Sequence, residues 1–220
     1  MKSLPGYFKH INKKTYLDRY PENIVKISNH KGKTLVEIGG GIGNDMLYLL
    51  KRGLNPRDLY FIENDVSAYN EAVKKLKRQF GFYSDHILYK DAKNTGLKDN
   101  IADFVYANNM LHCLKEKEEI LAVLREVFRM LQSGGVFFGR TLLNKIDQRR
   151  LKNISIPRNN EEKFVLQTSK ALNKDVLLGL SRAEFKMLAL NTGFSEVYTE
   201  IKKTLKKWKP IKDFYFRVKK

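Results

Sequence analysis

A run of glycines between two acidic residues is the first group in the sequence whose types and spacing suggest chemistry. A short apolar stretch, residues 34–38, contains Glu37, and glycines follow at positions 39, 40, 41 and 43. Glycines after a strand let the backbone approach a ligand closely where a helix begins. A second acid, Glu63, ends the next apolar stretch 20 residues after Gly43, where a carboxylate can bind ribose hydroxyls. This pattern predicts a site for a cofactor that contains a nucleoside.

The spacing of the glycines narrows the kind of cofactor. A dinucleotide site needs the pattern G-x-G-x-x-G, but neither Gly39-x-Gly41 nor Gly41-x-Gly43 is followed by a third glycine at the required place. Glu37 lies before the glycines, where it would repel a pyrophosphate and attract an ammonium group. A nucleoside that carries an amino acid fits better. We therefore expect S-adenosyl-L-methionine (SAM) as cofactor and S-adenosyl-L-homocysteine as product.

The elements that must position these residues alternate between strands and helices. The apolar pattern predicts strands at 34–38, 59–62, 86–89, 102–107 and 136–138, with amphipathic helices between them. Repeated β/α units imply a parallel sheet that helices cover on both faces, which is a doubly wound α/β domain. The last two expected strands, 194–198 and 213–218, have no helix between them, so we expect an antiparallel hairpin.

Five segments, in order along the chain, resemble motifs of the class I SAM-dependent methyltransferases, and especially of the ubiquinone/menaquinone C-methyltransferase-like branch (methyltransferase type 11). Residues 37–43 resemble the motif E/D-x-G-x-G-x-G, Glu63 with Ala72 resembles the acid and trailing alanine of the second motif, and Asp91–Ala92 resembles the pair after the third strand. Residues 105–114, VYANNMLHCL, resemble V-Y-S-N-x-x-L-H-H-L, and residues 125–135 resemble R-x-x-R-x-L-K-P-G-G. The resemblance extends from about Leu35 to Phe138, with a looser likeness in 181–197 and 213–218.

The resemblance implies a Rossmann-like sheet of seven strands, mostly parallel with an antiparallel last strand. It also implies roles for individual residues. Glu37 and the backbone of Gly39, Gly40 and Gly41 would hold the methionine end, Glu63 the ribose, Asp91 and Ala92 the adenine, and Asn108 the amino-acid portion. Asn64 follows the ribose acid where the family usually has an aliphatic residue on the adenine, and we count it among the expected cofactor contacts.

Methyl transfer from SAM requires mainly that the protein places the nucleophile in line with the methyl group. A base is needed only if the nucleophile carries a proton. His112, past the fourth strand, is the candidate base; the alternative is that it packs beside the cofactor pocket. Arg140 is a candidate contact for an anionic acceptor, or else part of a surface salt bridge. Gly40, where many relatives have cysteine, is expected to leave room beside the ligand, and Cys113 is expected to be buried.

The 220 residues carry a net charge of +18, of which residues 1–33 contribute +6 and residues 201–220 contribute +8. Basic ends can steer RNA, anionic lipid or acidic metabolites to a site, or only add solubility. The single cysteine excludes an internal disulfide and favours a reducing compartment. We expect a cytoplasmic protein with no signal peptide, no membrane span and no metal site.

The length fits one methyltransferase domain over residues 1–220. We expect an N-terminal lid (1–33) with the aromatic residues Tyr7, Phe8, Tyr16 and Tyr20, a SAM-binding core (34–143), and an insertion or substrate lid (144–180). Residues 181–220 would form a helix, begun by a capping box of Ser181 and Glu184, and the antiparallel hairpin.

These expectations favour a methyltransferase that transfers the sulfonium methyl group by in-line displacement to O, N or C of a small-molecule acceptor. An RNA (tRNA or rRNA) methyltransferase that uses the basic ends is an alternative, although Asn108–Leu111 lacks the D/N-P-P-Y/F motif of base-amine methyltransferases. A second alternative is a SAM-binding subunit that activates a partner and transfers nothing itself. An NAD-dependent oxidoreductase is the third.

Overall fold

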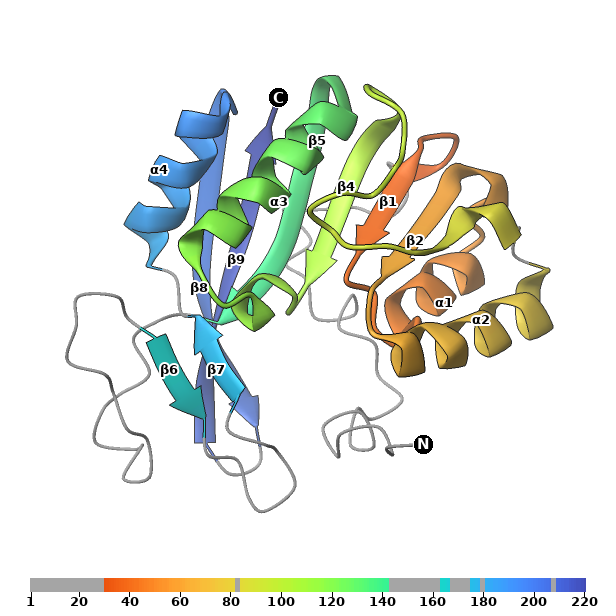
Figure 1. Ribbon diagram of the computed structural model, residues 1–220, viewed down its shortest axis with the longest axis horizontal. Helices are drawn as coiled ribbons and strands as arrows, with labels where there is room; N and C mark the ends of the chain where they lie inside the picture. Colours follow the sequence, from red (N-terminus) through yellow and green to blue (C-terminus); the bar gives the residue numbers. More distant parts are fainter. Residues whose placement is uncertain (1–29, 82–83, 143–162, 167–174, 179–180, 207–208) are drawn as a thin grey trace.

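Seven strands form one mixed sheet in the computed structural model, which describes residues 30–81, 84–142, 163–166, 175–178, 181–206 and 209–220 (Figure 1). Their order across the sheet is β3-β2-β1-β4-β5-β9-β8. The strands are β1 (Leu35–Ile38), β2 (Leu59–Glu63), β3 (Ile87–Tyr89), β4 (Ala102–Asn108), β5 (Leu131–Leu142), β8 (Glu196–Lys206) and β9 (Lys209–Lys219). Strands β1 to β5 pair in parallel, whereas β9 is antiparallel to both β5 and β8. The predicted seven-stranded, doubly wound sheet with an antiparallel last strand is confirmed.

Helices cover both faces of this sheet because successive strand residues point to opposite sides. Val36, for example, packs in the same cluster as helices α3 (Lys117–Met130) and α4 (Arg182–Thr192). Its neighbour Leu35 packs with α1 (Asn44–Lys51) and α2 (Val66–Phe80) on the other face. The short 3-10 helices η4 (Pro56–Asp58), η5 (Ser84–His86) and η6 (Leu111–Cys113) lie in the connections between the strands and helices of the described sheet.

The predicted capping box at the start of α4 is confirmed. The backbone N–H of Ser181 donates to Glu184 Oε2 at 2.9 Å, and the backbone N–H of Glu184 donates to Ser181 Oγ at 3.2 Å. Lys117 Nζ also lies 2.8 Å from Glu184 Oε1, which joins α3 to α4. Burial raises the pKa of Glu184, but the bonds from Lys117 and Ser181 outweigh it and lower this pKa to about 2.

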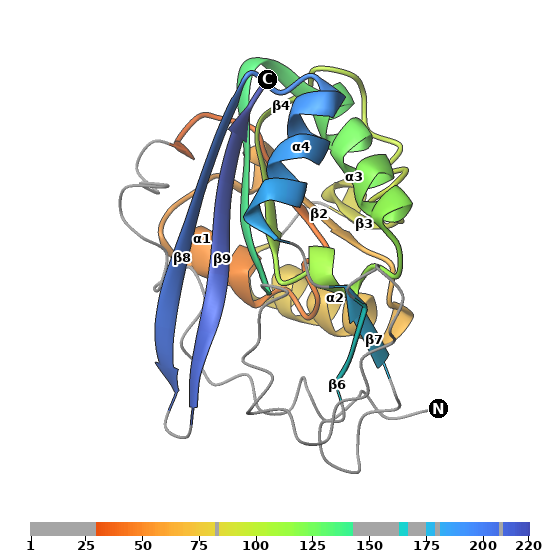
Figure 2. The ribbon, with the colours of Figure 1, turned by 90° about the vertical axis from the view of Figure 1, so that its left-hand side faces the viewer.

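The last two strands are longer than the sequence predicted. The pairing of β9 with β5 extends to Asp213 opposite Leu142, but the pairing of β8 with β9 continues to Lys206 opposite Lys209. Figure 2 shows the two strands continuing as a ribbon past the end of β5. Lysines interrupt the apolar pattern here, which hides a strand whose backbone hydrogen bonds do not depend on apolar side chains.

The expected insertion at 144–180 contains a second, two-stranded antiparallel sheet of β6 (Lys163–Leu166) and β7 (Asp175–Leu178). Strand β7 lies against η6, at the end of β4. The rest of the insertion and the N-terminal aromatic residues lie outside the described residues. Within the described part of the chain, no helix is long and apolar enough to cross a membrane.

Candidate cofactor site

A hollow of about 230 Å³ opens at the carboxyl ends of β1, β2 and β4. This is the edge at which open α/β sheets bind ligands, beside the switch point between β1 and β4. Five of the predicted cofactor residues line the hollow: Gly39, Glu63, Asn64, Asp91 and Ala92. The other predicted residues, Glu37, Gly40, Gly41, Asn108 and His112, do not line it.

Glu63 joins the glycine turn to the end of β2. Its Oε2 accepts the backbone N–H of Gly41 at 2.7 Å, and its Oε1 accepts the backbone N–H groups of Asn64 at 2.8 Å and Asp65 at 2.7 Å. A carboxylate has about four lone-pair sites, so about one remains for a further donor. These three hydrogen bonds hold the Glu63 side chain at the hollow. About one acceptor site remains for a ribose hydroxyl.

The glycine turn is tightly packed. Gly39 has φ +62°, and a Cβ there would lie 2.3 Å from Met110 Cγ, so only glycine fits. A Cβ at Gly40 would lie 2.2 Å from Cε2 of the buried Phe61 ring. The expectation that Gly40 leaves room beside the ligand is therefore wrong, because the Phe61 ring fills that space.

Glu37 lies beneath the turn, with 1% of its surface exposed. Burial and the negative charges of Asp45 and Glu63 raise its pKa well above the usual range, against a hydrogen bond from the Met46 backbone that lowers it. Its Oε2 has no hydrogen-bond partner among the described residues. A buried acceptor without a hydrogen bond costs free energy. This oxygen therefore favours a nearby ligand group that is cationic or donates a hydrogen bond.

Asp45 is a buried acid of this site that sequence reasoning missed. It lies in the first turn of α1, and its Oδ2 accepts the Tyr106 hydroxyl at 2.9 Å and Asn108 Nδ2 at 2.6 Å. The predicted site residue Asn108 is therefore held from α1, and its Oδ1 is buried without a hydrogen-bond partner in the described part of the chain. A polar residue in the first turn of a helix is common on a solvated face, so the sequence contained no signal of this role.

Polar side chains surround the expected adenine end of the hollow. Asn64 Nδ2 lies 3.5 Å from Asp91 Oδ2, and Lys93 Nζ lies 3.6 Å from the same oxygen and 2.7 Å from Glu119 Oε1. Asp65, the second polar residue after Glu63, caps α2 by accepting the Ala68 backbone N–H at 2.7 Å. Asn64 therefore lies in the hollow, whereas the side chain of Asp65 stabilises the start of α2.

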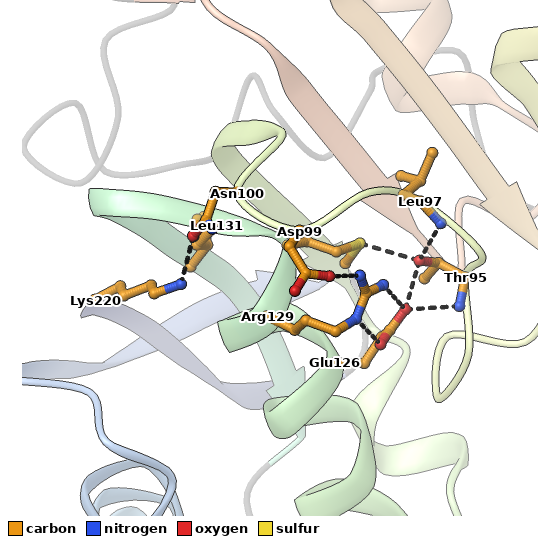
Figure 3. Close-up of polar contacts among 9 residues, drawn as sticks. Thr95, Leu97, Asp99, Asn100, Glu126, Arg129, Leu131 and Lys220 are labelled. Atoms are coloured by element: carbon orange, nitrogen blue, oxygen red, sulfur yellow. Dashed lines mark hydrogen bonds and ion pairs between the residues drawn. The ribbon is translucent and has the colours of Figure 1, made fainter.

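A partly buried network of Thr95, Glu126, Arg129 and Asp99 holds the loop after β3 (Figure 3). The same loop contains Asp91 and Ala92. Glu126 Oε1 accepts both the backbone N–H and the hydroxyl of Thr95, at 2.8 and 2.6 Å. Arg129 donates to both oxygens of Glu126 and to Asp99. Helix α3 therefore fixes the far side of the loop whose near side lines the hollow.

A family model described as "Methyltransferase domain" matches residues 8–177 of the chain. The chain belongs to this methyltransferase domain family. The predictions of a methyltransferase and of SAM as its cofactor are therefore confirmed at the level of the family.

Three relatives illustrate the likeness of this methyltransferase domain. A SAM-dependent methyltransferase from Methanosarcina mazei is similar in structure with a TM-score of 0.74 and 19% identity over 91% of this chain and 97% of that chain. Phosphoethanolamine N-methyltransferase 2 of Haemonchus contortus, solved with SAM, gives a TM-score of 0.61 at 13% identity over 86% and 49% of the two chains. Phosphoethanolamine N-methyltransferase 1 of Triticum aestivum is 27% identical over 54% of this chain and 23% of its own length.

A "Highly reducing polyketide synthase verA" from Penicillium polonicum is 29% identical over 56% of the chain. The matched region spans only 5% of that protein. The chain thus matches one region of each of these two curated relatives.

His112 of the methyltransferase domain is buried at the end of β4, with Nδ1 at 3.2 Å from Thr141 Oγ1. Burial, and after it the positive charge of Arg140, lower its pKa to about 4. Arg140 is itself 5% exposed and donates from Nε to Asn109 Oδ1 at 3.3 Å. Arg140 is therefore buried, and the expectation that it lies on the surface is wrong.

The low pKa of His112 predicts a pH dependence of stability. The folded-state pKa of about 4 lies below the usual 6.5, so the unfolded chain takes up the proton first as the pH falls. Stability is therefore fully present above about pH 6.5 and decreases by about 3 kcal/mol as the pH falls to about 4. We expect His112→Gln to remove this decrease in urea unfolding measured from pH 7.5 to 4. The difference between the two proteins at pH 7.5 reports packing alone, and identical pH profiles would contradict the prediction.

Cys113 is exposed, and it lines the hollow, where the sequence predicted a buried residue. It is the last residue of η6, whose earlier residues Leu111 and His112 enter the core. Burial of these two turns the next side chain outward. Among the described residues, no group of three or more His, Cys, Asp or Glu side chains is arranged to hold a metal ion.

Proposed function

We propose that this chain transfers the methyl group of SAM to O, N or C of a small-molecule acceptor. The observation that supports it best is the hollow itself, in which Gly39, Glu63 and Asp91 come together at the carboxyl edge of the sheet of a methyltransferase domain. When bound, SAM supplies a sulfonium that already activates its methyl group.

Different residues of the chain would contact the ribose, the adenine and the methionine end of the cofactor. Glu63 would hold the ribose with its remaining lone pair, and Asn64, Asp91 and Ala92 would contact the adenine. The orphaned oxygens of Glu37 and Asn108 fit the cationic methionine end, together with the backbone of Gly39, Gly40 and Gly41. These roles orient the cofactor, which is the main requirement of an in-line displacement.

We expect the methyl acceptor to enter between this hollow and two segments that we propose as lids. Residues 1–33 and 144–180 are proposed as lids, and the position of β7 against η6 supports this for the second. His112 stays a candidate base, but a neutral imidazole with a pKa of about 4 is a weak proton acceptor at neutral pH. A loss of kcat below about tenfold in His112→Gln would assign it to packing, since a general base usually contributes about a hundredfold or more.

Calorimetric titration with SAM, S-adenosyl-L-homocysteine and NADH tests the proposal. Saturable one-site binding of the first two alone is expected, followed by transfer of labelled methyl groups into a metabolite extract. Absence of binding by either adenosyl ligand would overturn the proposal. Preferential binding of NADH would favour the NAD-dependent oxidoreductase instead.

Two more specific classes of methyl acceptor can be compared within this proposal. The likeness of Val105–Leu114 to the V-Y-S-N-x-x-L-H-H-L motif supports the ubiquinone/menaquinone C-methyltransferase-like branch. The names of two relatives point instead to methylation of an amine on a phosphorylated substrate. Separate assays with a quinol precursor and with phosphoethanolamine distinguish them.

An RNA acceptor is the second candidate, and the β8–β9 ribbon favours it. The register puts Lys203 opposite Lys212 and Lys206 opposite Lys209. Residues 201–220 carry a net charge of +8, and basic residues of this kind can neutralise the phosphates of a nucleic acid. Replacing these four lysines with glutamine is expected to reduce tRNA binding and its dependence on salt. Lys219→Gln, on the same strand but paired with Glu196 at 3.0 Å, is the control.

A SAM-binding subunit that activates a partner would bind SAM and remain inactive with every acceptor when alone. Activity restored by a co-purified partner would establish it. Turnover by the isolated chain excludes it.

A further inference from the structure

Three polar side chains of the candidate site, Glu37, Tyr106 and Asn108, share the sheet face that α1 covers. Glu37 of β1 is opposite Tyr106 of β4 in the parallel register, and Asn108 follows Tyr106 by two residues, so its side chain points to the same face. Asp45 on α1 contacts both β4 residues, and its charge acts on Glu37. Two buried carboxyl groups therefore lie next to each other between the helix and the sheet.

Asp45 determines which way the Asn108 amide faces. Asn108 Nδ2 lies 2.6 Å from Asp45 Oδ2. An ionised carboxylate only accepts hydrogen bonds, so the nitrogen of the amide must face it. Asn108 Oδ1 is then turned away from Asp45, as a buried acceptor with no hydrogen-bond partner among the described residues.

The two carboxyl groups have unequal support for a negative charge. Asp45 Oδ2 accepts two side-chain hydrogen bonds, from Tyr106 and Asn108, which stabilise its ionised form. Glu37 is nearly fully buried, and within the described part of the chain the hydrogen bond that lowers its pKa comes from the Met46 backbone alone. The charged groups that act on Glu37 there are Asp45 from α1 and Glu63 from β2, both negative. Glu37 is therefore the member of the pair that binds a proton more readily.

We propose that Asp45 is a positioning residue for the cofactor, which keeps Asn108 Oδ1 as an acceptor for the ammonium group of the methionine moiety, and that binding of this ammonium drives the release of a proton from Glu37. The inference rests on the proposed function. The Oε–H bond of Glu37 breaks, its electron pair stays on the carboxylate, and the proton passes to the solvent. The ammonium keeps its own protons and replaces the lost positive charge beside the two acids.

Calorimetry in buffers of different ionisation enthalpy measures this release directly. The measurement is made at about pH 6.5, where a free α-amino group is already protonated and does not itself take up a proton. We expect SAM and S-adenosyl-L-homocysteine to release up to one proton per site. We expect 5′-methylthioadenosine, which has the same adenosine and thioether but no amino-acid group, to bind without release.

Three variants separate the roles of the residues. Glu37→Gln is expected to abolish proton release. Asp45→Asn, which loses the anchor of the Asn108 amide, is expected to weaken SAM binding about tenfold while 5′-methylthioadenosine binds as before, and to reduce the proton release. Glu118→Gln, an exposed acid of α3, is the control and should leave both quantities unchanged.

The outcomes distinguish this inference from the proposed function. Binding of SAM without proton release, or the same release with 5′-methylthioadenosine, overturns the inference and leaves the function intact. Equal loss of affinity for both ligands in Asp45→Asn shows a structural role and overturns the positioning role. If neither ligand binds the unaltered chain, the proposed function fails.

Discussion

Replacing Glu63 with alanine is expected to reduce the affinity for SAM by about a hundredfold, which corresponds to about 2.7 kcal/mol. The carboxylate accepts three backbone N–H groups, one of them from Gly41 in the glycine turn. Its loss removes the proposed ribose contact and also the bond that holds the turn to β2. Because the ribose is common to both ligands, SAM and 5′-methylthioadenosine should lose affinity equally in a calorimetric titration.

Asp65→Ala is the matched control for this variant. Asp65 is next but one to Glu63 and caps α2 through its side chain, while its own backbone N–H still donates to Glu63. Loss of the cap should cost about 1 kcal/mol of folding stability and leave SAM affinity nearly unchanged. A Glu63→Ala protein that binds SAM as well as Asp65→Ala does would remove Glu63 from the proposed site.

The strands of the sheet could be predicted because each is marked by a short run of neighbouring residues in the sequence. Apolar runs followed by Gly39 or Glu63 mark strand ends, and the carboxyl ends of neighbouring parallel strands meet at one edge. The hollow that joins Gly39, Glu63 and Asp91 follows from that geometry. The ends of β8 and β9 were missed because lysines replace the apolar residues that mark a strand.

Packing between distant residues explains what the sequence could not predict about the site. The space beside Gly40 depends on the Phe61 ring, and the exposure of Cys113 depends on how η6 turns. The role of Asp45 requires that α1 lies over Asn108, 63 residues further along the chain. No local pattern records such a contact.

Removing Arg129 is expected to have the largest effect on stability. Glu126, 9% exposed, accepts bonds from Arg129 and Thr95, and Arg129 also reaches Asp99 (Figure 3). Burial raises the pKa of Glu126, but the bonds from Arg129 and Thr95 outweigh it and leave this pKa below its usual value. Arg129→Met leaves that carboxylate buried without its cation. We expect the free energy of unfolding to fall by about 3 kcal/mol, measured in urea at pH 7.

A double variant and a neighbouring arginine decide whether the lost charge is the cause. Replacing Glu126 with methionine together with Arg129 removes the orphaned charge, so the double variant should be more stable than Arg129→Met alone. Arg125→Met, one helical turn earlier and exposed, should change stability by less than about 0.5 kcal/mol. If Arg129→Met costs no more than Arg125→Met, the network does not stabilise the fold. Because Thr95 ties Glu126 to the loop of Asp91, a weakened network should also reduce the affinity for SAM, and this links the stability of α3 to the adenine end of the site.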